Sequence, residues 1–408
     1  MNTSFPKSDI KVLLLENISP KAKEIFEHAG YTNIEIVKSA LTEDELLEKL
    51  SDVRILGIRS KTQLTEKVLK NATKLMAIGC YCIGTNQVDL EAAAKEGIAV
   101  FNSPFSNTRS VAELIIASSI MLLRRITYKS AEAHKGNWLK DNIDSYEVRG
   151  KNIGIVGYGH IGSQVSIMAE ALGMHVYYYD IEGKLPLGNA QSLDSLDELI
   201  KISDIVTLHV PETPETRNLI TKEVLAKFKK GSYLLNLSRG NVVDIEALKE
   251  ALESGHILGA AIDVFPQEPK DKNEKFVSPL QGLPNVILTP HIGGSTEEAQ
   301  WNIGIDASNK MIKFMETGSS LASHSIPELS LPIVKNTHRI LHIHKNVPGM
   351  LAKINKIISD LEINILSQYL ATDENIGYVV LDIPKETSDI VFKEINTIEN
   401  TIKTRLLY

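Results

Sequence analysis

The sequence has few of the features that mark secreted, membrane-spanning or nucleic-acid-binding proteins. Its 408 residues include only two cysteines, Cys80 and Cys82, as is usual in a reducing compartment. The N-terminal segment MNTSFPKSD is polar and lacks the apolar core of a signal peptide. The longest conspicuous apolar segment, 114–123, is far shorter than the roughly 20 residues of a membrane-spanning helix. A formal net charge of −7 gives no electrostatic case for nucleic-acid binding, so we predict a cytoplasmic protein.

Metal binding also has little support. The C-x-C spacing of Cys80 and Cys82 is compatible with a metal site, but no second cluster of cysteine or histidine accompanies it. We therefore predict buried free thiols and no metal. Hydrophobic residues make up 43% and charged residues 23% of the chain, which is ordinary for globular domains. The length allows two or three such domains.

A glycine-rich turn carries the clearest functional signal. The run 153–156 is apolar and predicts a buried strand, and a helical pattern occupies 161–172. Gly157, Gly159 and Gly162 lie at this junction in the spacing G-x-G-x-x-G. In dinucleotide-binding folds the first glycine permits the tight turn, the second lets the backbone approach the pyrophosphate, and the third lets the helix pack on the strand. The helix N-terminus offers N–H groups to the pyrophosphate, so we predict a dinucleotide site.

Asp180 indicates which dinucleotide binds. It ends a second predicted strand, 175–179, about 20 residues after the glycines, where a carboxylate accepts hydrogen bonds from an adenosine ribose. An ordinary glycine-rich turn, the alternative, leaves the placement of Asp180 to chance. The carboxylate would repel a 2′-phosphate, and the next residues, Ile181 and Glu182, supply no arginine to bind one. We therefore predict NAD rather than NADP.

Alternating strand and helix patterns predict two parallel sheets. Residues 11–101 alternate in this way but carry no glycine fingerprint, so this first α/β domain is expected to bind something other than the dinucleotide. The dinucleotide fold continues with predicted strands at 205–209, 232–236, 260–262 and 286–288. Long helices are predicted at 107–126 and 296–315, and we expect the second to return to the first domain. A cleft between the domains would then hold the ligands.

The C-terminal part predicts a third, smaller domain. After a loop-like stretch the elements follow the order βαββαβ, with the second strand expected at 363–370. This is the ferredoxin-like arrangement. The predicted fold class is therefore α/β: a discontinuous flavodoxin-like substrate-binding domain (1–106 and 295–330), an inserted Rossmann NAD-binding domain (107–294) and a ferredoxin-like regulatory domain (337–408).

Three residues at strand ends suit hydride transfer from a hydroxy acid, which needs a base for the hydroxyl proton and a cation for the carboxylate. His291, in LTPHIGG, has an ordinary pKa of roughly 6.5 that suits proton exchange. Glu268, in DVFPQEP, can hold its other ring nitrogen. Arg239, in LLNLSRGN, can grip a carboxylate with its planar guanidinium. Each alone could form a surface ion pair, but three at the ligand-binding edge of one sheet favour catalysis.

Together these segments resemble the D-isomer-specific 2-hydroxyacid dehydrogenases. The glycine fingerprint, SRG after LLN, DVFPQEP and PHIGG carry the resemblance. It implies that Arg239 binds the substrate carboxylate, that His291 is the acid/base and that Glu268 pairs with it. Asp263, in AAIDVF, would contact the nicotinamide carboxamide. The NAD site that we expect comprises Gly157, Gly159, His160, Ile161, Gly162, Asp180, Leu237, Ser238, Arg239, Asp263, His291, Gly293 and Gly294.

Further segments, IRSKTQLT, AIGCYCIGTNQVDL and FNSPFSNTRSVAEL, resemble the members that end in one ACT domain. This implies NAD-dependent oxidation of 3-phospho-D-glycerate to 3-phosphohydroxypyruvate, the first step of L-serine biosynthesis, with side reduction of 2-oxoglutarate in some members. Arg59, Ser60 and Lys61 resemble the phosphate-binding loop, although the family often has a second arginine where this chain has Lys61, and lysine lacks the planar fork. Asn107 could reach the substrate carboxylate. Lys140 could approach from a neighbouring subunit or be a solvated surface lysine.

The ACT domain is expected to regulate the enzyme. Its segment HIHKNVPGM, 342–350, resembles the strand-to-helix loop that effector-binding ACT domains place against a second subunit. The resemblance implies that His344, Asn346 and Asn364 bind L-serine, which would inhibit by feedback. It also implies a homo-oligomer, a tetramer built through NAD-domain and ACT-domain contacts. In the alternative, Asn346 merely caps the following helix.

Two other interpretations stay open. A different D-2-hydroxyacid dehydrogenase, acting on glycerate or lactate, would leave Arg59, Lys61 and the C-terminal effector residues without a purpose. A non-catalytic co-regulator on the same scaffold would sense NAD and bind protein partners without turnover. The acidic net charge and the intact set of Arg239, Glu268 and His291 argue against the co-regulator.

Overall fold

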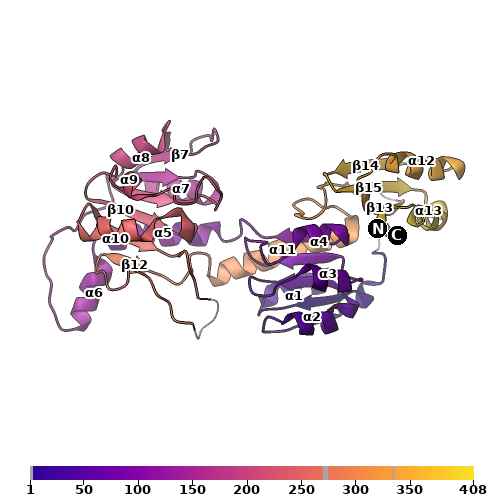
Figure 1. Cartoon of the computed structure of the whole chain (residues 1–408), viewed down its shortest axis with the longest axis horizontal. Helices are drawn as coiled ribbons and strands as arrows, with labels where there is room; N and C mark the ends of the chain where they lie inside the picture. The colour runs from indigo at the N-terminus through magenta and orange to yellow at the C-terminus, as the bar shows by residue number, and fades with distance from the viewer. Residues whose placement is uncertain (1–2, 270–273, 333, 335) are drawn as a thin grey trace. The chain divides into compact units, whose positions relative to one another are not determined.

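Three sheets with their helices are formed by the described residues of the computed structural model, 3–269, 274–332, 334 and 336–408. The chain divides into two units, one of Met1–Ser106 with Gln300–Tyr408 and one of Asn107–Ala299. Figure 1 labels their elements. The predicted α/β class with two parallel sheets and a C-terminal antiparallel sheet is confirmed.

The first sheet is parallel, in the order β2-β1-β3-β4-β5, which is the strand order of flavodoxin-like folds. Its strands are β1 (Lys11–Leu14), β2 (Ile34–Ile36), β3 (Val53–Ile58), β4 (Ala77–Cys80) and β5 (Ala99–Asn102). The accompanying helices are η1 (Lys7–Asp9), α1 (Pro20–His28), α2 (Glu43–Lys49), η2 (Leu50–Asp52), α3 (Glu66–Asn71) and α4 (Leu90–Lys95). Because hydrophobic residues line both faces of the sheet, its strands are largely buried, except for the edge strand β2, which is partly exposed.

Helix α11 (Glu297–Thr317) packs on this first sheet, as predicted. The hydroxyls of Tyr81 and Ser308 form a hydrogen bond of 2.7 Å. Gly79 in β4 leaves room for the Met311 side chain, because a Cβ on residue 79 would collide with that side chain. The sheet and α11 therefore share one hydrophobic core.

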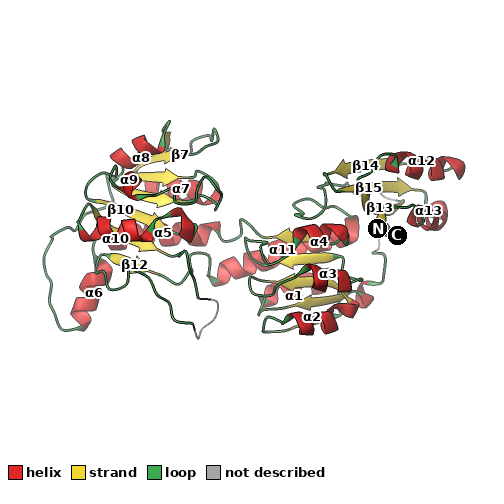
Figure 2. Cartoon of the chain, in the orientation of Figure 1, coloured by secondary structure: helices red, strands yellow, loops and turns green. Residues whose placement is uncertain are grey.

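The second sheet is parallel, in the order β12-β11-β10-β9-β6-β7-β8. Numbered from β6, the first six strands run 3-2-1-4-5-6, the Rossmann order. The strands are β6 (Asn152–Val156), β7 (His175–Tyr179), β8 (Gln191–Ser192), β9 (Ile205–Leu208), β10 (Ser232–Asn236), β11 (Ile257–Ile262) and β12 (Val286–Leu288). The helices that cover the sheet are α5 (Thr108–Leu123), α7 (His160–Ala171), α8 (Leu196–Ile202), α9 (Lys222–Leu225), η3 (Gly240–Val242) and α10 (Ile245–Glu253). Helix α6 (Ile126–His134) projects away from the sheet (Figure 2) and has no buried residue.

The third sheet is antiparallel, in the order β14-β15-β13-β16. Its strands are β13 (His338–Lys345), β14 (Ser367–Thr372), β15 (Ile376–Ile383) and β16 (Thr401–Leu407), and its helices are α12 (Met350–Asp360), η4 (Lys385–Thr387) and α13 (Ser388–Asn396). The two longer helices cover one face. The other face contributes Leu341, Tyr378 and Leu407 to the hydrophobic core of the first sheet. The sheet therefore packs directly on its own unit.

A buried ion pair anchors the third sheet. Arg339 and Asp382 have fully buried side chains, and two hydrogen bonds of 2.7 and 2.9 Å join them. The guanidinium also donates to the carbonyls of Thr317 and Pro332, each at 2.8 Å. Its charge is thus well compensated, and the pair ties β13 to β15 and to the chain that follows α11.

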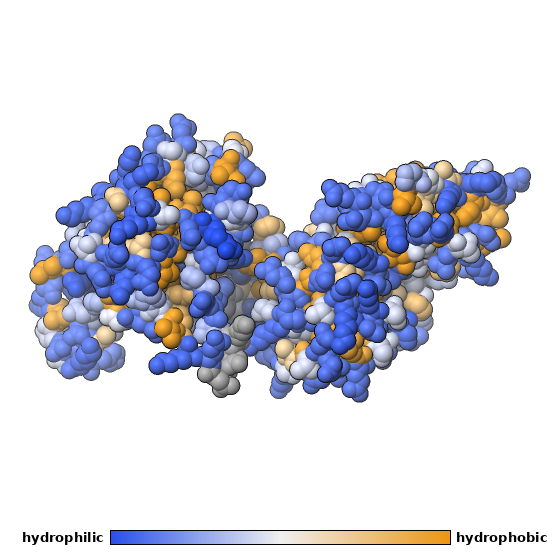
Figure 3. Space-filling view, viewed as in Figure 1, coloured by the Kyte–Doolittle hydropathy of each residue, from blue (hydrophilic) through white to orange (hydrophobic). Residues whose placement is uncertain are grey.

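Two predicted elements differ in the structure. The helix expected over 107–126 ends at Leu123, because Arg125 has a left-handed backbone with φ of 51°, and a separate helix, α6, begins at Ile126. The strand expected from Ile363 begins only at Ser367, after Glu362 takes φ of 54°. No described helix is long and apolar enough to cross a membrane. The surface in Figure 3 is mostly hydrophilic, with scattered hydrophobic residues.

Candidate active site

The glycine-rich turn joins β6 to α7. Gly157 has φ of 91°, and a Cβ there would lie 2.5 Å from the carbonyl oxygen of His209. Gly162, in the first turn of α7, approaches the backbone of Gly157 so closely that a Cβ would collide with it. A Cβ on Gly159 would meet no atom within 4 Å. The first and third glycines are thus required by packing, while the second faces open space at the N-terminus of the helix, where a pyrophosphate fits.

Asp180 lies against this turn. It follows β7, and its Oδ2 accepts a hydrogen bond of 2.7 Å from the N–H of Tyr158. Its Oδ1 accepts one of 2.9 Å from the N–H of Glu182. Each carboxylate oxygen keeps a further lone pair, so the group can also accept hydrogen bonds from ribose hydroxyls.

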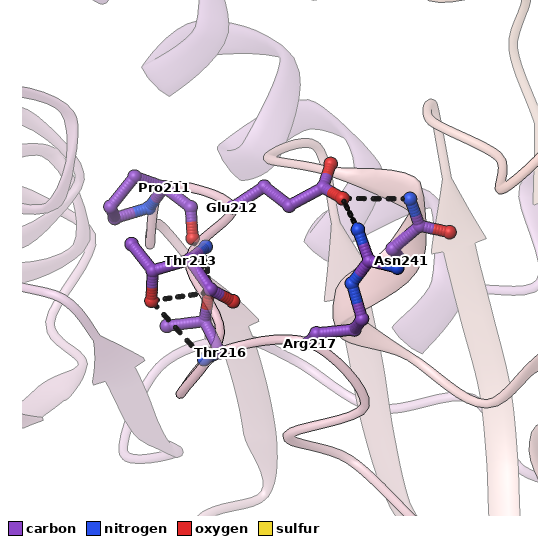
Figure 4. Close-up of polar contacts among 6 residues, drawn as sticks. All are labelled: Pro211, Glu212, Thr213, Thr216, Arg217 and Asn241. Atoms are coloured by element: carbon purple, nitrogen blue, oxygen red, sulfur yellow. Dashed lines mark hydrogen bonds and ion pairs between the residues drawn. The ribbon is translucent and has the colours of Figure 1, made fainter.

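The loop after β9 is held by polar contacts that we did not predict (Figure 4). The Glu212 carboxylate accepts hydrogen bonds from Arg217, at 3.0 Å, and from Asn241, at 2.9 Å. The Thr216 hydroxyl accepts from the N–H of Thr213 at 2.8 Å and donates to the carbonyl of Pro211 at 2.6 Å. Because Asn241 lies in η3, these contacts join the loop after β9 to the loop after β10. The signal in the sequence was the polar run PETPETRN, which begins at Pro211, shortly after a buried strand.

Arg239 lies in the turn that follows β10. The fully buried side chain of Asn236 shapes this turn, because its amide oxygen accepts from the N–H of Ser238 at 3.1 Å and its amide nitrogen donates to the carbonyl of Arg239 at 2.9 Å. Leu237 and Ser238 are buried as well. Asn236 therefore positions the predicted arginine, a role that a single asparagine at a strand end does not reveal.

The turn with Arg239 packs against the segment with Glu268. Gly240 approaches the backbone of Phe265 and Pro266 so closely that any Cβ would collide with both. The charge of Arg239 accordingly acts on both Glu268 and His291. The three predicted catalytic residues thus gather at the carboxyl ends of β10, β11 and β12.

Glu268 and His291 form the predicted pair. His291 Nδ1 lies 2.9 Å from Glu268 Oε2, and Glu268 Oε1 accepts from the N–H of Phe265 at 3.1 Å. The hydrogen bond to Glu268 raises the pKa of His291 above its ordinary value, although burial opposes this. Burial alone would raise the pKa of Glu268, but the hydrogen bonds from His291 and Phe265 bring it below its ordinary value. With Nδ1 donating to the carboxylate, Nε2 is the nitrogen left for a substrate.

Asp263 shapes the loop that carries His291. Its side chain is buried, and Oδ1 accepts from the Thr289 hydroxyl at 2.6 Å and from the N–H of Ile292 at 2.8 Å. Oδ2 accepts from the N–H of Gly293 at 2.8 Å. These bonds hold His291 in a left-handed conformation, with φ of 54°, that a histidine rarely adopts. The nicotinamide contact implied by the resemblance stays a prediction.

Asn107 lies beside the same loop. It directly precedes α5 and is 9% exposed, and its side-chain amide lies where a Cβ on Gly294 would be. Its Oδ1 is buried and has no hydrogen-bond partner among the described residues. The structure therefore brings Asn107 together with the loop of His291, Gly293 and Gly294.

Comparisons with known proteins bear on this site. Residues 116–293 match the NAD binding domain of D-isomer specific 2-hydroxyacid dehydrogenases, and residues 340–403 match an AHAS small subunit-like ACT domain. The chain is 53% identical over 405 residues to D-3-phosphoglycerate dehydrogenase of Haemophilus influenzae, covering 99% of each. It is 52% identical over 407 residues to that of Escherichia coli K12, again covering 99% of each. The chain belongs to the D-3-phosphoglycerate dehydrogenase branch of the D-isomer-specific 2-hydroxyacid dehydrogenases.

Solved structures are also similar to this chain over its first two domains. The structure of TT0316 from Thermus thermophilus has a TM-score of 0.67 and 34% identity, covering 75% of this chain and 97% of that one. A D-lactate dehydrogenase from Aquifex aeolicus, in complex with NAD and lactic acid, has a TM-score of 0.66 and 28% identity, covering 78% and 100%. The chain is therefore an NAD-dependent oxidoreductase, and the prediction of an NAD-binding domain is confirmed.

The phosphate-binding loop expected in this family lies in the other unit. Arg59 is partly buried, while Ser60 and Lys61 are exposed. Glu16, 8% exposed, holds the loop by accepting hydrogen bonds from three backbone N–H groups, those of Arg59 at 3.1 Å, Lys61 at 3.0 Å and Thr62 at 2.9 Å. Glu16 thus orients two cations through their backbone. We did not predict this role, since a lone acid after the first strand gives no such signal.

The two cysteines and Lys140 are the next predicted residues to be placed by the structure. Cys80 is buried, as predicted, Cys82 is only partly buried, and both are free thiols. Lys140 is exposed in the segment after Trp138, itself 85% exposed. The described residues contain no group of three or more side chains able to hold a metal ion.

Two of the predicted effector residues lie at the junction of β13 and α12, and the third, Asn364, lies in the loop at the other end of α12. His344 is 3% exposed, and its Nε2 is buried without a partner among the described residues. The Asn346 side chain donates to the carbonyl of Asp373 at 2.6 Å. Asn364 is exposed in the loop before β14. Because Gly349 is the residue that caps α12, the alternative that Asn346 caps this helix is wrong.

Proposed function

We propose that this enzyme oxidises 3-phospho-D-glycerate to 3-phosphohydroxypyruvate with NAD, the first step of L-serine biosynthesis, and that L-serine inhibits it through the ACT domain. The observation that carries the proposal is the hydrogen bond of 2.9 Å between His291 and Glu268, beside Arg239 at the edge of the NAD-binding sheet. The close similarity to D-3-phosphoglycerate dehydrogenases over almost the full length, C-terminal domain included, supports the choice of substrate.

The three residues divide the chemistry. Arg239 binds the substrate carboxylate through its guanidinium and polarises the forming carbonyl. His291 Nε2 takes the proton of the 2-hydroxyl group as C2 loses its hydride. Glu268 stabilises the imidazolium that results and keeps Nδ1 as the protonated nitrogen. NAD, when bound at the glycine-rich turn, accepts the hydride.

The remaining residues select the substrate. Arg59, Ser60 and Lys61 bind the phosphate, with their loop held by Glu16. The Asn107 amide binds the carboxylate, and Lys140 reaches the site from a neighbouring subunit. Neither glycerate nor lactate carries a phosphate that would use these cations.

The proposal extends to the regulation and the assembly of the enzyme. His344, Asn346 and Asn364 bind L-serine between two subunits, since amide and imidazole groups suit both the carboxylate and the ammonium of a zwitterion. The enzyme is a tetramer built through its NAD-binding and ACT domains. We retain the three-domain division at 1–106 with 295–330, 107–294 and 337–408, and place the enzyme in the cytoplasm because its two thiols are free.

Initial rates of NADH oxidation test the proposal. Turnover with 3-phosphohydroxypyruvate that greatly exceeds turnover with hydroxypyruvate, pyruvate or 2-oxoglutarate supports the substrate, and suppression by L-serine supports the regulation. Faster turnover of an unphosphorylated oxo acid would point to another 2-hydroxyacid dehydrogenase. A His291→Ala variant that binds NADH but has lost turnover excludes the co-regulator.

A further inference from the structure

A pocket of about 400 Å³ in the first unit has a strongly basic lining. It lies between the edge strand β16, which supplies Lys403 and Arg405, and the first domain, which supplies Arg54 and Lys74. It shares no residue with the catalytic or serine sites proposed above. Four cations therefore face one cavity that has no assigned role.

Arg405 is the most buried of these cations. Its residue is 6% exposed, and its Nη2 donates to the carbonyl of Met315 at 2.8 Å. Its Nε and Nη1 are buried and have no hydrogen-bond partner among the described residues. The guanidinium lies 5.2 Å from the centre of the Phe314 ring, which compensates part of its charge. Since buried donors are normally paired, the two unpaired nitrogens still indicate a missing acceptor.

The other three cations differ in their burial and partners, and Lys74 is exposed. Arg54 stacks on the ring of Phe5 at 4.1 Å, and its Nε is buried and unpaired in the described part of the chain. Lys403 donates to the carbonyl of Leu75 at 2.8 Å, and burial together with the charge of Arg405 lowers its pKa to about 8, although Glu96 opposes this. None of the four cations forms an ion pair with a carboxylate of a described residue. Clustered positive charge of this kind is costly unless an anion compensates it.

The rest of the lining suits a phosphate group. The hydroxyls of Ser4 and Thr404 are also buried without a partner in the described residues, and each can donate a hydrogen bond. The volume lies in the range of small-molecule sites. Guanidinium groups bind phosphate oxygens with two parallel hydrogen bonds.

We propose that this pocket binds a small dianion of the phosphate class, either inorganic phosphate or a phosphomonoester, through Arg54, Lys74, Lys403 and Arg405. The proposal rests on the pocket alone and not on the function proposed above. An occupant would contact both the first domain and β16, and so would link the C-terminal sheet to it.

Calorimetric titration of the full-length enzyme tests this. The Arg59→Gln/Lys61→Gln double variant, saturated with NADH, serves as background, because the substrate and cofactor sites then compete little for phosphate. We expect one phosphate per chain to bind in this background. Adding Arg405→Gln should weaken binding at least tenfold and Lys74→Gln about threefold, whereas Lys229→Gln, at a surface ion pair of the other unit, should not change it.

Titrations with inorganic phosphate and with glycerol 3-phosphate, at equal ionic strength, distinguish the two kinds of ligand. The one that binds more tightly shows whether the pocket prefers the free anion or a phosphomonoester. Should Arg405→Gln fail to fold, Arg54→Gln and the exposed Lys74→Gln carry the same test. The proposal is overturned if the background binds neither anion, or if these substitutions leave binding unchanged. Loss of catalytic activity in the background bears only on the substrate site.

Discussion

Replacement of Glu268 by glutamine should slow catalysis through His291 while preserving the shape of the site. The carboxylate now accepts two hydrogen bonds, from His291 Nδ1 and from the N–H of Phe265. A glutamine amide has one accepting and one donating end. If its oxygen stays with Phe265, its NH₂ faces Nδ1, which must then accept, so that Nε2 carries the proton and cannot take one from the substrate. If the amide flips, two donors face each other at Phe265.

The size of the effect follows from these losses. A hydrogen bond to a charged partner contributes roughly 1.5–3 kcal/mol, and an unmade one costs about 1–3 kcal/mol. The side chains of His291 and Glu268 are 52% and 36% exposed, so the lower ends of both ranges apply. Together they amount to about 2.5 kcal/mol, which corresponds to a roughly 70-fold fall in kcat.

The pH dependence of the rate provides a second measurement. Glu268 raises the pKa of His291, so the pKa should fall in the Glu268→Gln variant. Oxidation needs the neutral imidazole and slows as pH falls through this pKa, so the acid limb should move to lower pH. Reduction needs the imidazolium and slows as pH rises through the pKa, so the alkaline limb should also move to lower pH.

Stopped-flow and steady-state rates in both directions check these outcomes, with Glu250→Gln, in a surface ion pair with Lys222, as a matched control. NADH binding should stay within twofold of the wild type. A kcat within threefold of the wild type, or pH limbs that do not move, would refute the role that we assign to the pair.

Three further predictions concern residues that hold the site and the fold. Asp263→Asn removes one acceptor from the loop of the catalytic histidine, so kcat should fall about tenfold in steady-state assays, and an unchanged kcat would contradict the positioning role. Glu16→Gln should raise KM for 3-phosphohydroxypyruvate about fivefold, roughly 1 kcal/mol, with kcat within twofold, and the exposed Glu48→Gln should change neither. Asp382→Ala leaves the charge of Arg339 buried without a carboxylate, so urea unfolding should show a loss of about 3–5 kcal/mol; a loss below 1 kcal/mol would show that the pair is not the anchor.

Local patterns predicted the sheets and the main motifs well. The spacing of Gly157, Gly159 and Gly162 is followed by a helix that begins at His160, and Asp180 lies against that turn as expected. Helix α2 begins with a capping box, in which the Thr42 N–H donates to the Glu45 carboxylate at 2.7 Å. These features depend on residues close in the chain, whose geometry the backbone of a turn or helix start dictates.

Errors arose where backbone conformation was decided by surroundings. The left-handed Arg125 splits an apolar helical pattern that contains no glycine or proline to mark the break. The delayed start of β14 follows a left-handed Glu362, again an ordinary residue in an unusual conformation. Neither arginine nor glutamate is a residue type that indicates a positive φ. The predictions from hydrophobic periodicity alone therefore extended the helix and the strand too far.

The sequence by itself determined the fold class, the NAD-binding turn and the identity of the residues proposed for catalysis, because each of these depends on short segments with characteristic spacing. Only the tertiary structure showed what holds them. Asn236, Asp263 and Glu16 each bond to the backbone of a loop that carries a proposed functional residue, and the basic pocket at Arg405 joins segments more than 300 residues apart in the chain. Such roles depend on which strand ends and chain segments meet in space, and the pairing of distant segments is a property of the packed sheets rather than of any local pattern.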